Sequence, residues 1–199
     1  MIDKKKLIII DGIDGAGKST QLDMLPYMKI NFPNYNSDTG KLIRKYLDGA
    51  MPLDVYSASV LYALDRKCFK MPEGDVENDI VVSGRYTSSN IIHQMSRLNQ
   101  SNWDGYIEWL FDLEYEKMKI KKPDAVIFLD IDPEVSKAHM TGRVLDIHEQ
   151  NLEYQKKCRE AGLYAAEKLN WEVIGVTTIE NTNFGIEKYI KSKIKKQEE

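Results

Sequence analysis

Short apolar runs alternate along the chain with longer segments in which apolar residues recur at helical spacing. Residues 7–10, 79–83 and 125–130 are nearly continuous apolar runs bounded by polar or turn-forming residues, and residues 171–176 form a plausible fourth run. Apolar runs without polar alternation are typical of parallel strands buried on both faces of a sheet. These runs therefore predict the strands of a parallel sheet.

Residues 39–47 and 57–69 have apolar residues three or four positions apart, which predicts two amphipathic helices. The second of these helices has one apolar stripe, made of Val60, Leu61, Leu64 and Cys68. Residues 103–118 and 149–169 predict two longer helices. Strands that alternate with helices favour a doubly wound α/β fold, in which a parallel β-sheet is flanked by α-helices on both faces.

Composition narrows the class of protein. A chain of 199 residues fits one domain over residues 1–199, or one domain that carries a small lid. The 28 Lys and Arg residues nearly balance the 31 Asp and Glu residues, so the chain lacks the basic excess that drives non-specific nucleic-acid binding. The apolar run near the N-terminus is too short for a signal peptide or a membrane span. We therefore expect a cytoplasmic protein that binds neither nucleic acid nor membranes.

Residues 12–19, Gly-Ile-Asp-Gly-Ala-Gly-Lys-Ser, match the phosphate-binding pattern G-x-x-x-x-G-K-S/T directly after the first predicted strand. In such a loop, glycines let backbone N–H groups converge on an anion, and the next helix adds its positive end. We expect Lys18 to bridge the β- and γ-phosphates and Ser19 to bind Mg²⁺. The residues expected to hold the nucleotide are Gly12, Gly15, Ala16, Gly17, Lys18, Ser19 and Thr20.

A phosphate-binding loop alone does not separate kinases from GTPases or motors. The chain has no N-K-x-D motif for reading guanine, and it is too short to carry motor or transporter domains. Of the classes of protein that carry such a loop, a small-molecule phosphotransferase therefore fits this chain best. Arg85 follows a predicted strand immediately, at the carboxyl end where open α/β sheets bind ligands.

The segment from Ser19 to Phe32 is short for the elements that it must contain. A crossover between parallel strands needs a dozen or more residues including its helix. Either the helix after the phosphate-binding loop is truncated, or residues are missing from the sequence.

Six segments in order resemble thymidylate kinases over nearly the whole chain. They are residues 11–21, 32–35, 62–66, 85–90, 123–130 with Pro133 and Glu134, and 146–149. The amino-acid sequences of residues 62–66 and 85–90 are similar to those of a bacterial branch of the family. The resemblance implies a P-loop NTPase fold with a short lid at about residues 140–149, a homodimer, and phosphoryl transfer from MgATP to dTMP.

The resemblance also implies roles for residues of the acceptor pocket. Tyr62 would stack on thymine, and Arg66, which shares its helix face, would hydrogen-bond the base edge. The alternatives are a core aromatic for Tyr62 and a surface ion pair for Arg66. Further base-contacting positions are matched by Ser89, Asn90 and His93. For His93, a packed helix residue is as good an interpretation as a base contact.

Around the phosphates, the resemblance makes Arg85 a phosphate clamp and places Asp14 near the acceptor sugar and the metal. Further residues match the acceptor-side wall and the lid, namely Phe32, Tyr35, Asp146 and Glu149. Some relatives place an arginine where this chain has Gly15. The resemblance then makes Arg143, in the lid, the candidate for the positive charge on the transferring phosphoryl group, and a solvated loop arginine is the alternative.

One position departs from the family pattern. The family usually has Asp directly before the Arg-Tyr pair, and this chain has Gly84. Two other functions therefore stay open: a related kinase for another deoxynucleotide or nucleoside, and a catalytically weakened P-loop protein that binds nucleotide.

Overall fold

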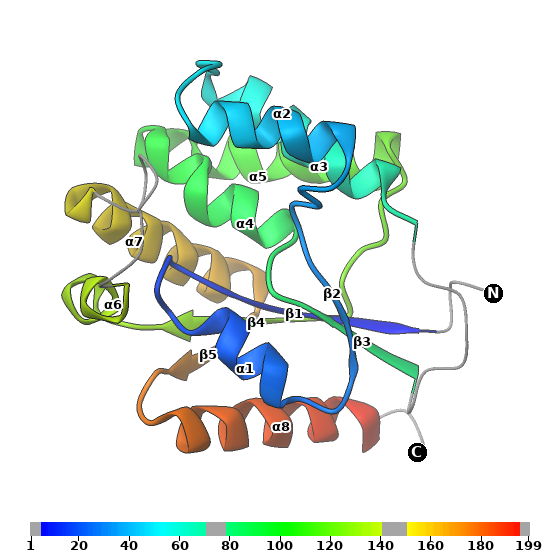
Figure 1. Cartoon of the computed structure of the whole chain (residues 1–199), viewed down its shortest axis with the longest axis vertical. Helices are drawn as coiled ribbons and strands as arrows, with labels where there is room; N and C mark the ends of the chain where they lie inside the picture. The colour runs from blue at the N-terminus through cyan, green and yellow to red at the C-terminus, as the bar shows by residue number, and fades with distance from the viewer. Residues whose placement is uncertain (1–4, 71–78, 141–150, 196–199) are drawn as a thin grey trace.

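A five-stranded parallel sheet forms the centre of the computed structural model, which describes residues 5–70, 79–140 and 151–195 (Figure 1). The strand order is β2-β3-β1-β4-β5, and every neighbouring pair is parallel. The strands are β1 (Lys6–Gly12), β2 (Met28–Ile30), β3 (Ile80–Ser83), β4 (Ala125–Asp130) and β5 (Glu172–Gly175). The four predicted strands are confirmed, and the strand that leads into the phosphate-binding loop lies in the middle.

Helices cover both faces of this sheet, as predicted (Figure 1). One face carries α1 and α8, and the other carries α4 and α7, with α2 and α3 in a further layer beyond α4. The helices are α1 (Lys18–Met24), α2 (Asp38–Leu47), α3 (Val55–Cys68), α4 (Thr87–His93), α5 (Trp103–Phe111), α6 (Pro133–His139), α7 (Leu152–Leu169) and α8 (Ile179–Lys195).

Strand β1 divides the core into two halves because its side chains alternate between the two faces. Leu7 and Ile9 pack in one cluster and Ile8 and Ile10 in the other, and each of these side chains is at most 1% exposed. Burying such a side chain contributes about 1.5–3 kcal/mol relative to leaving it in water. The continuous apolar run thus anchors the strand from both sides.

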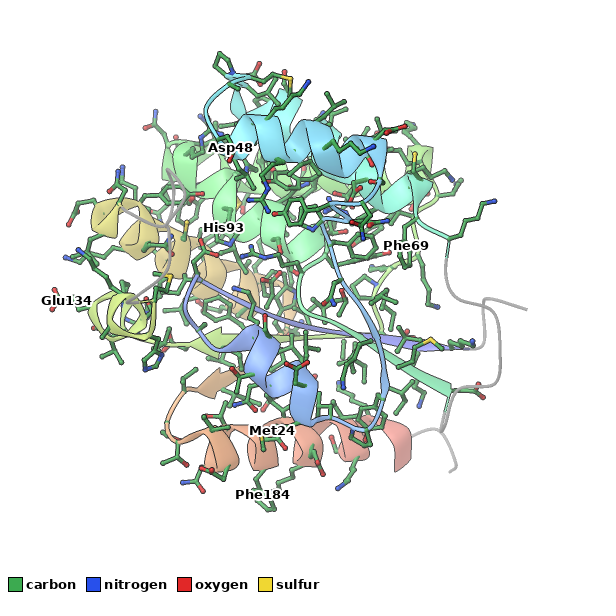
Figure 2. All side chains as sticks on the ribbon, viewed as in Figure 1. Met24, Asp48, Phe69, His93, Glu134 and Phe184 are labelled. Atoms are coloured by element: carbon green, nitrogen blue, oxygen red, sulfur yellow. The ribbon has the colours of Figure 1, made fainter. Side chains whose placement is uncertain are left out.

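Helix α1 is short, as the limited length of the segment from Ser19 to Phe32 requires. It spans seven residues from Lys18, and its labelled last residue, Met24, is 44% exposed (Figure 2). The turn after it is closed by a bond from the Leu25 N–H to the Leu22 carbonyl at 3.1 Å, and strand β2 begins at Met28. Of the two alternatives, the structure shows the truncated helix.

The apolar stripe predicted for α3 faces mostly away from the core, and of its residues only Leu61 is half-buried, where it packs against the cluster around Ile43. Val60 and Leu64 are 43% and 40% exposed, and Cys68 is exposed as well. The buried face instead consists of Val55, Ala58, Ser59, Ala63, Asp65 and Arg66. Polar side chains can take this face because Asp65 and Arg66 are satisfied there by hydrogen bonds and an ion pair.

The long helix predicted over residues 103–118 is α5 followed by a π-helical segment, Asp112–Lys117. Within that segment Glu114 is fully buried. The helix predicted from residue 149 is α7, which begins at Leu152 behind the capping residue Asn151. Residues 149 and 150 lie outside the described residues.

Candidate functional site

The loop between β1 and α1 opens onto a cleft of about 630 Å³. Gly15 and Gly17 adopt the left-handed backbone, with φ of 76° and 86°. A Cβ on Gly15 would lie 2.5 Å from the Ser136 carbonyl oxygen of α6, so only glycine fits there. Of the residues predicted to hold the nucleotide, all except Gly12 line this cleft.

Lys18 lies folded over its own loop. Its Nζ donates to the carbonyl oxygens of Gly12 and Ile13 at 2.7 and 2.8 Å, and the residue is 8% exposed. Burial lowers the pKa of Lys18 to about 8, and the nearby Arg85 adds to this effect. A phosphate group in the cleft would stabilise the charged form, so Lys18 is placed to bind an anion.

Asp14 and Arg85 form an ion pair across the cleft wall. Arg85 Nη2 lies 2.6 Å from Asp14 Oδ1, and the Asp14 side chain is 8% exposed. Burial alone would raise the pKa of Asp14, but the surrounding positive charges, that of Arg85 first and that of Lys18 as well, together outweigh burial and hold that pKa well below its usual range. The structure thus brings together two of the predicted site residues, both charged.

Gln155 of α7 holds Asp14 from the other side. Its Nε2 donates to Asp14 Oδ2 at 3.1 Å, and its Oε1 accepts from the Asp14 backbone N–H at 3.3 Å. This residue was not predicted, because it lies in a helix rich in Glu and Lys, where nothing in the sequence distinguishes it. It fixes the orientation of the Asp14 carboxylate.

His93 contacts Arg85 at the end of α4 and lies inside the molecule between the helices (Figure 2). Its Nε2 is 3.3 Å from Arg85 Nη1. A guanidinium only donates, so Nε2 accepts and the ring proton is on Nδ1, which lies 3.6 Å from Cys158 Sγ. Burial lowers the pKa of His93 to about 4, so the ring is neutral at physiological pH. His93 is thus a packed helix residue that contacts Arg85, the predicted phosphate clamp, and its contact with the base stays a prediction.

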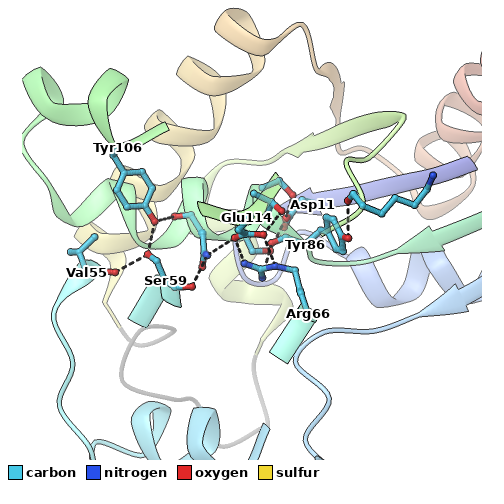
Figure 3. A network of polar contacts seen from close by, with 12 residues as sticks. Asp11, Val55, Ser59, Arg66, Tyr86, Tyr106 and Glu114 are labelled. Carbon is cyan, nitrogen blue, oxygen red and sulfur yellow. Dashed lines mark hydrogen bonds and ion pairs between the residues drawn. The ribbon is translucent and has the colours of Figure 1, made fainter. Parts of the chain in front are cut away.

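Arg66 belongs to a buried network centred on Glu114 (Figure 3). Its Nε donates to Glu114 Oε2 at 3.0 Å, and the two side chains are 2% and 0% exposed. Thr87 and Asn90 donate to the same carboxylate at 2.6 and 3.2 Å. Burial alone would lower the pKa of Arg66, but Glu114 raises it above the usual value. The alternative of a surface ion pair is therefore wrong, because the pair is buried.

Ser89 connects α4 to the start of the phosphate-binding loop. The hydroxyls of Ser88 and Ser89 donate to Asp11 Oδ2 at 2.7 and 2.6 Å, and Asp11 Oδ1 accepts from the Gly12 N–H at 2.9 Å. Asp11 is fully buried. Ser89 thus contacts Asp11 at the end of β1, directly before the predicted phosphate-binding loop, and its contact with the base stays a prediction.

The aromatic residues predicted for the acceptor side differ in exposure. Phe32 is 7% exposed and packs against the ring of Phe69 at a centroid distance of 4.9 Å. Tyr62 is half-buried, with its ring edge-on to Tyr46 at 6.4 Å. Tyr35 is 40% exposed and stacks under the Arg44 guanidinium. Phe32 therefore builds core and Tyr35 lies at the surface, whereas Tyr62 packs at the edge of the core cluster that contains Tyr46.

The predicted lid residues Arg143, Asp146 and Glu149 lie outside the described residues. Among residues 5–70, 79–140 and 151–195, no group of three or more His, Cys, Asp or Glu side chains is placed to hold a metal ion. No helix in the same ranges is both long and apolar enough to cross a membrane.

A parallel sheet with a phosphate-binding loop at the end of its central strand, and a lysine and an arginine on one cleft, defines a P-loop phosphotransferase. Comparison with known proteins gives the family. The model of the family described as "Thymidylate kinase" matches residues 10–183. The chain therefore belongs to the thymidylate kinase family, whose members are nucleoside monophosphate kinases.

Individual relatives agree with this assignment. The chain is 30% identical to a probable thymidylate kinase of Methanocaldococcus jannaschii, with 96% of this chain and 98% of the relative covered. It is 26% identical to the thymidylate kinase of Mycobacterium tuberculosis, with 80% and 84% covered. The solved structure of thymidylate kinase from Candida albicans superposes with a TM-score of 0.74 at 22% identity, covering 95% and 92% of the two chains. With archaeal as well as bacterial relatives, the similarity does not single out a bacterial branch.

Proposed function

We propose that this chain is a thymidylate kinase that transfers the γ-phosphoryl group of MgATP to dTMP, giving dTDP and ADP. One observation carries the proposal beyond family membership. Lys18 from the phosphate-binding loop and Arg85 from the end of β3 line the same cleft, where they can bind the phosphates of donor and acceptor. Phosphoryl transfer depends mainly on such positioning and on charge stabilisation.

In this proposal the loop residues hold the ATP phosphates and Lys18 neutralises the charge on the β- and γ-phosphates. Arg85 clamps the phosphate of dTMP, and its contact with neutral His93 supports it without adding a second positive charge. Asp14, held by Gln155, lies beside the acceptor sugar. The lid residues Arg143 and Glu149 stay part of the prediction, with Arg143 as the charge on the transferring group.

Mg²⁺ would be held by Ser19 and Asp14, and when bound it spreads the charge that moves between donor and acceptor. Ser19 is exposed on the cleft, which suits a direct hydroxyl ligand. Both carboxylate oxygens of Asp14 already accept hydrogen bonds, from Arg85 and Gln155. Asp14 therefore fits contact with the metal through water better than direct ligation.

For the acceptor base, we propose a pocket formed by Tyr62, Arg66 and Asn90, with Phe32 and Tyr35 on its wall. The Glu114 carboxylate supports this assignment because it holds the Arg66 guanidinium and the Asn90 amide in fixed positions. A fixed guanidinium loses little entropy when it binds a planar base edge. Nucleotide preference is set by this pocket.

An assay that couples ADP release to a detectable signal tests the proposal against a panel of nucleosides and nucleoside monophosphates. The proposal expects dTMP to give the highest kcat/KM. A higher value for another nucleotide or nucleoside would instead identify a related kinase. ATP binding with turnover no greater than that of buffer would identify a catalytically weakened P-loop protein.

We further propose a homodimer that pairs the exposed stripe of α3. Tyr56, Val60 and Leu64 repeat every four residues on this helix and are 40–44% exposed. Light scattering after size-exclusion chromatography should give twice the 23.0 kDa of one chain, and Val60→Glu should give a monomer. A wild-type monomer would refute this interface.

A cytoplasmic location and a single domain with a lid at residues 140–149 also stay predictions.

A further inference from the structure

Gln21 has an unpaired hydrogen-bond acceptor beside the proposed donor site. It lies on α1, three residues after Lys18, lines the cleft and is 3% exposed. Its Nε2 donates to the Ile179 carbonyl oxygen at 3.1 Å. A carbonyl oxygen only accepts, so this bond fixes which end of the amide is the N–H₂ group. Gln21 Oε1 is then buried with no hydrogen-bond partner among the described residues.

Native proteins rarely leave a buried acceptor unpaired, because the lost hydration is not replaced. The position of Gln21 along the cleft suggests the missing partner. The donor phosphates belong at the loop around Lys18, and the wall on the side of β5 and α8 is formed by residues 176–179 and Thr182. Gln21 contacts this wall through Ile179, so a triphosphate whose sugar and base extend along the wall would pass Gln21.

We propose that Gln21 Oε1 accepts a hydrogen bond from the exocyclic amine of the donor adenine and thereby selects adenine over guanine. The inference rests on the proposed function, since it requires a purine triphosphate in this cleft. At the corresponding ring position adenine carries an N–H₂ donor and guanine carries a carbonyl acceptor. Two acceptors cannot bond, so guanine would leave Gln21 unpaired. Because Gln21 Oε1 is buried in the structure, the proposed bond requires the wall formed by residues 176–179 to shift as the base enters.

A purely structural role for Gln21 makes a different prediction. Its Nε2 and its backbone carbonyl, which accepts from Asn183 Nδ2 at 3.5 Å, both connect α1 with α8. Loss of these connections would weaken all donor nucleotides by the same factor. The ratio between donors with and without the amine therefore isolates base recognition from support of the helices.

The experiment compares ATP with purine riboside triphosphate, which lacks only the exocyclic amine, and with GTP, at saturating dTMP. For the wild type, we expect kcat/KM to fall about 3- to 10-fold without the amine, the worth of one neutral hydrogen bond, and at least as far with GTP. Gln21→Met should bring ATP and purine riboside triphosphate to equal kcat/KM. Gln21→Glu retains an acceptor and should retain the difference.

Asn183→Leu is the matched control, because it removes one α1–α8 contact and keeps the acceptor, and it should also retain the difference. Equal losses for both donors in Gln21→Met would overturn the inference while leaving the kinase function intact. A wild type without turnover would count against the proposed function instead. In that case, calorimetry gives the dissociation constants of the same donors. The ratio of these constants between ATP and purine riboside triphosphate, in the wild type and in each variant, then decides the role of Gln21.

Discussion

The buried pair of Arg66 and Glu114 allows a sharp prediction for stability. Arg66→Ala removes the guanidinium but leaves the Glu114 carboxylate, whose side chain is 0% exposed, with bonds from neutral groups such as Thr87 and Asn90. Removing one partner of a buried ion pair costs about 3–5 kcal/mol of unfolding free energy. Replacing both partners costs less, because the penalty of burying an unpaired charge disappears as well.

For a domain of this size, 1 kcal/mol shifts the Tm by about 2–4 °C, so Arg66→Ala should lower it by about 6–20 °C. Thermal unfolding followed by circular dichroism and calorimetry measures this shift. The double variant Arg66→Met with Glu114→Gln should recover much of the loss. Lys41→Ala breaks an exposed pair with Asp38 and should leave the Tm unchanged. A Tm for Arg66→Ala equal to that of the wild type would refute this account of the network.

The same variant also tests the acceptor pocket. Measured below its Tm, Arg66→Ala should raise the KM for dTMP about 10- to 100-fold if a charge-assisted hydrogen bond to the base is lost. The KM for ATP should change little, because Lys18 and the loop residues hold the donor. Equal effects on both substrates would leave Arg66 with the structural role alone.

Three further predictions concern the cleft. Lys18→Ala should abolish phosphoryl transfer without changing the fold, as steady-state kinetics and thermal unfolding would show, and near-normal turnover would contradict the role of Lys18. The pKa of His93 is about 4 in the folded chain against 6.5 unfolded, so unfolding binds a proton between these values and stability falls by about 3 kcal/mol as the pH drops from 6.5 to 4. Urea unfolding of His93→Gln should lack this decrease, and parallel pH curves would exclude it. Gly84→Asp should lower the Tm, because a Cβ at this position would lie 2.4 Å from Leu22 Cδ1. The same variant should raise kcat at low Mg²⁺ if the missing carboxylate limits metal positioning. An unchanged kcat would show that the missing carboxylate does not limit it.

The sheet could be predicted from the sequence because its central strands are buried on both faces and therefore consist of apolar runs. The buried face of α3 could not. Apolar spacing indicates a core face only where the core is apolar, and Asp65 and Arg66 are buried by partners distant in sequence. Asp65 accepts from Thr39, 26 residues away, and Arg66 pairs with Glu114, 48 residues away. Most of the apolar stripe, namely Val60, Leu64 and Cys68, was thus left on the surface.

The phosphate-binding loop could be predicted for the opposite reason, since its chemistry lies within consecutive residues whose spacing is set by the backbone. The support of that loop is not local. Gln155 reaches Asp14 across 141 residues, and Ser88 reaches Asp11 across 77. Neither contact leaves a pattern along the chain, because each depends only on where a helix crosses the end of β1.

Arg85 shows how this non-local support serves the proposed chemistry. A phosphate clamp must stay in the cleft before substrate arrives, yet remain able to bind an anion. Asp14 supplies a counter-charge at 2.6 Å, while His93 accepts a hydrogen bond at 3.3 Å without carrying charge. A protonated imidazole at that distance would repel the guanidinium and could no longer accept from it. Burial, which keeps His93 neutral down to a pH of about 4, is therefore the condition under which Arg85 holds its position.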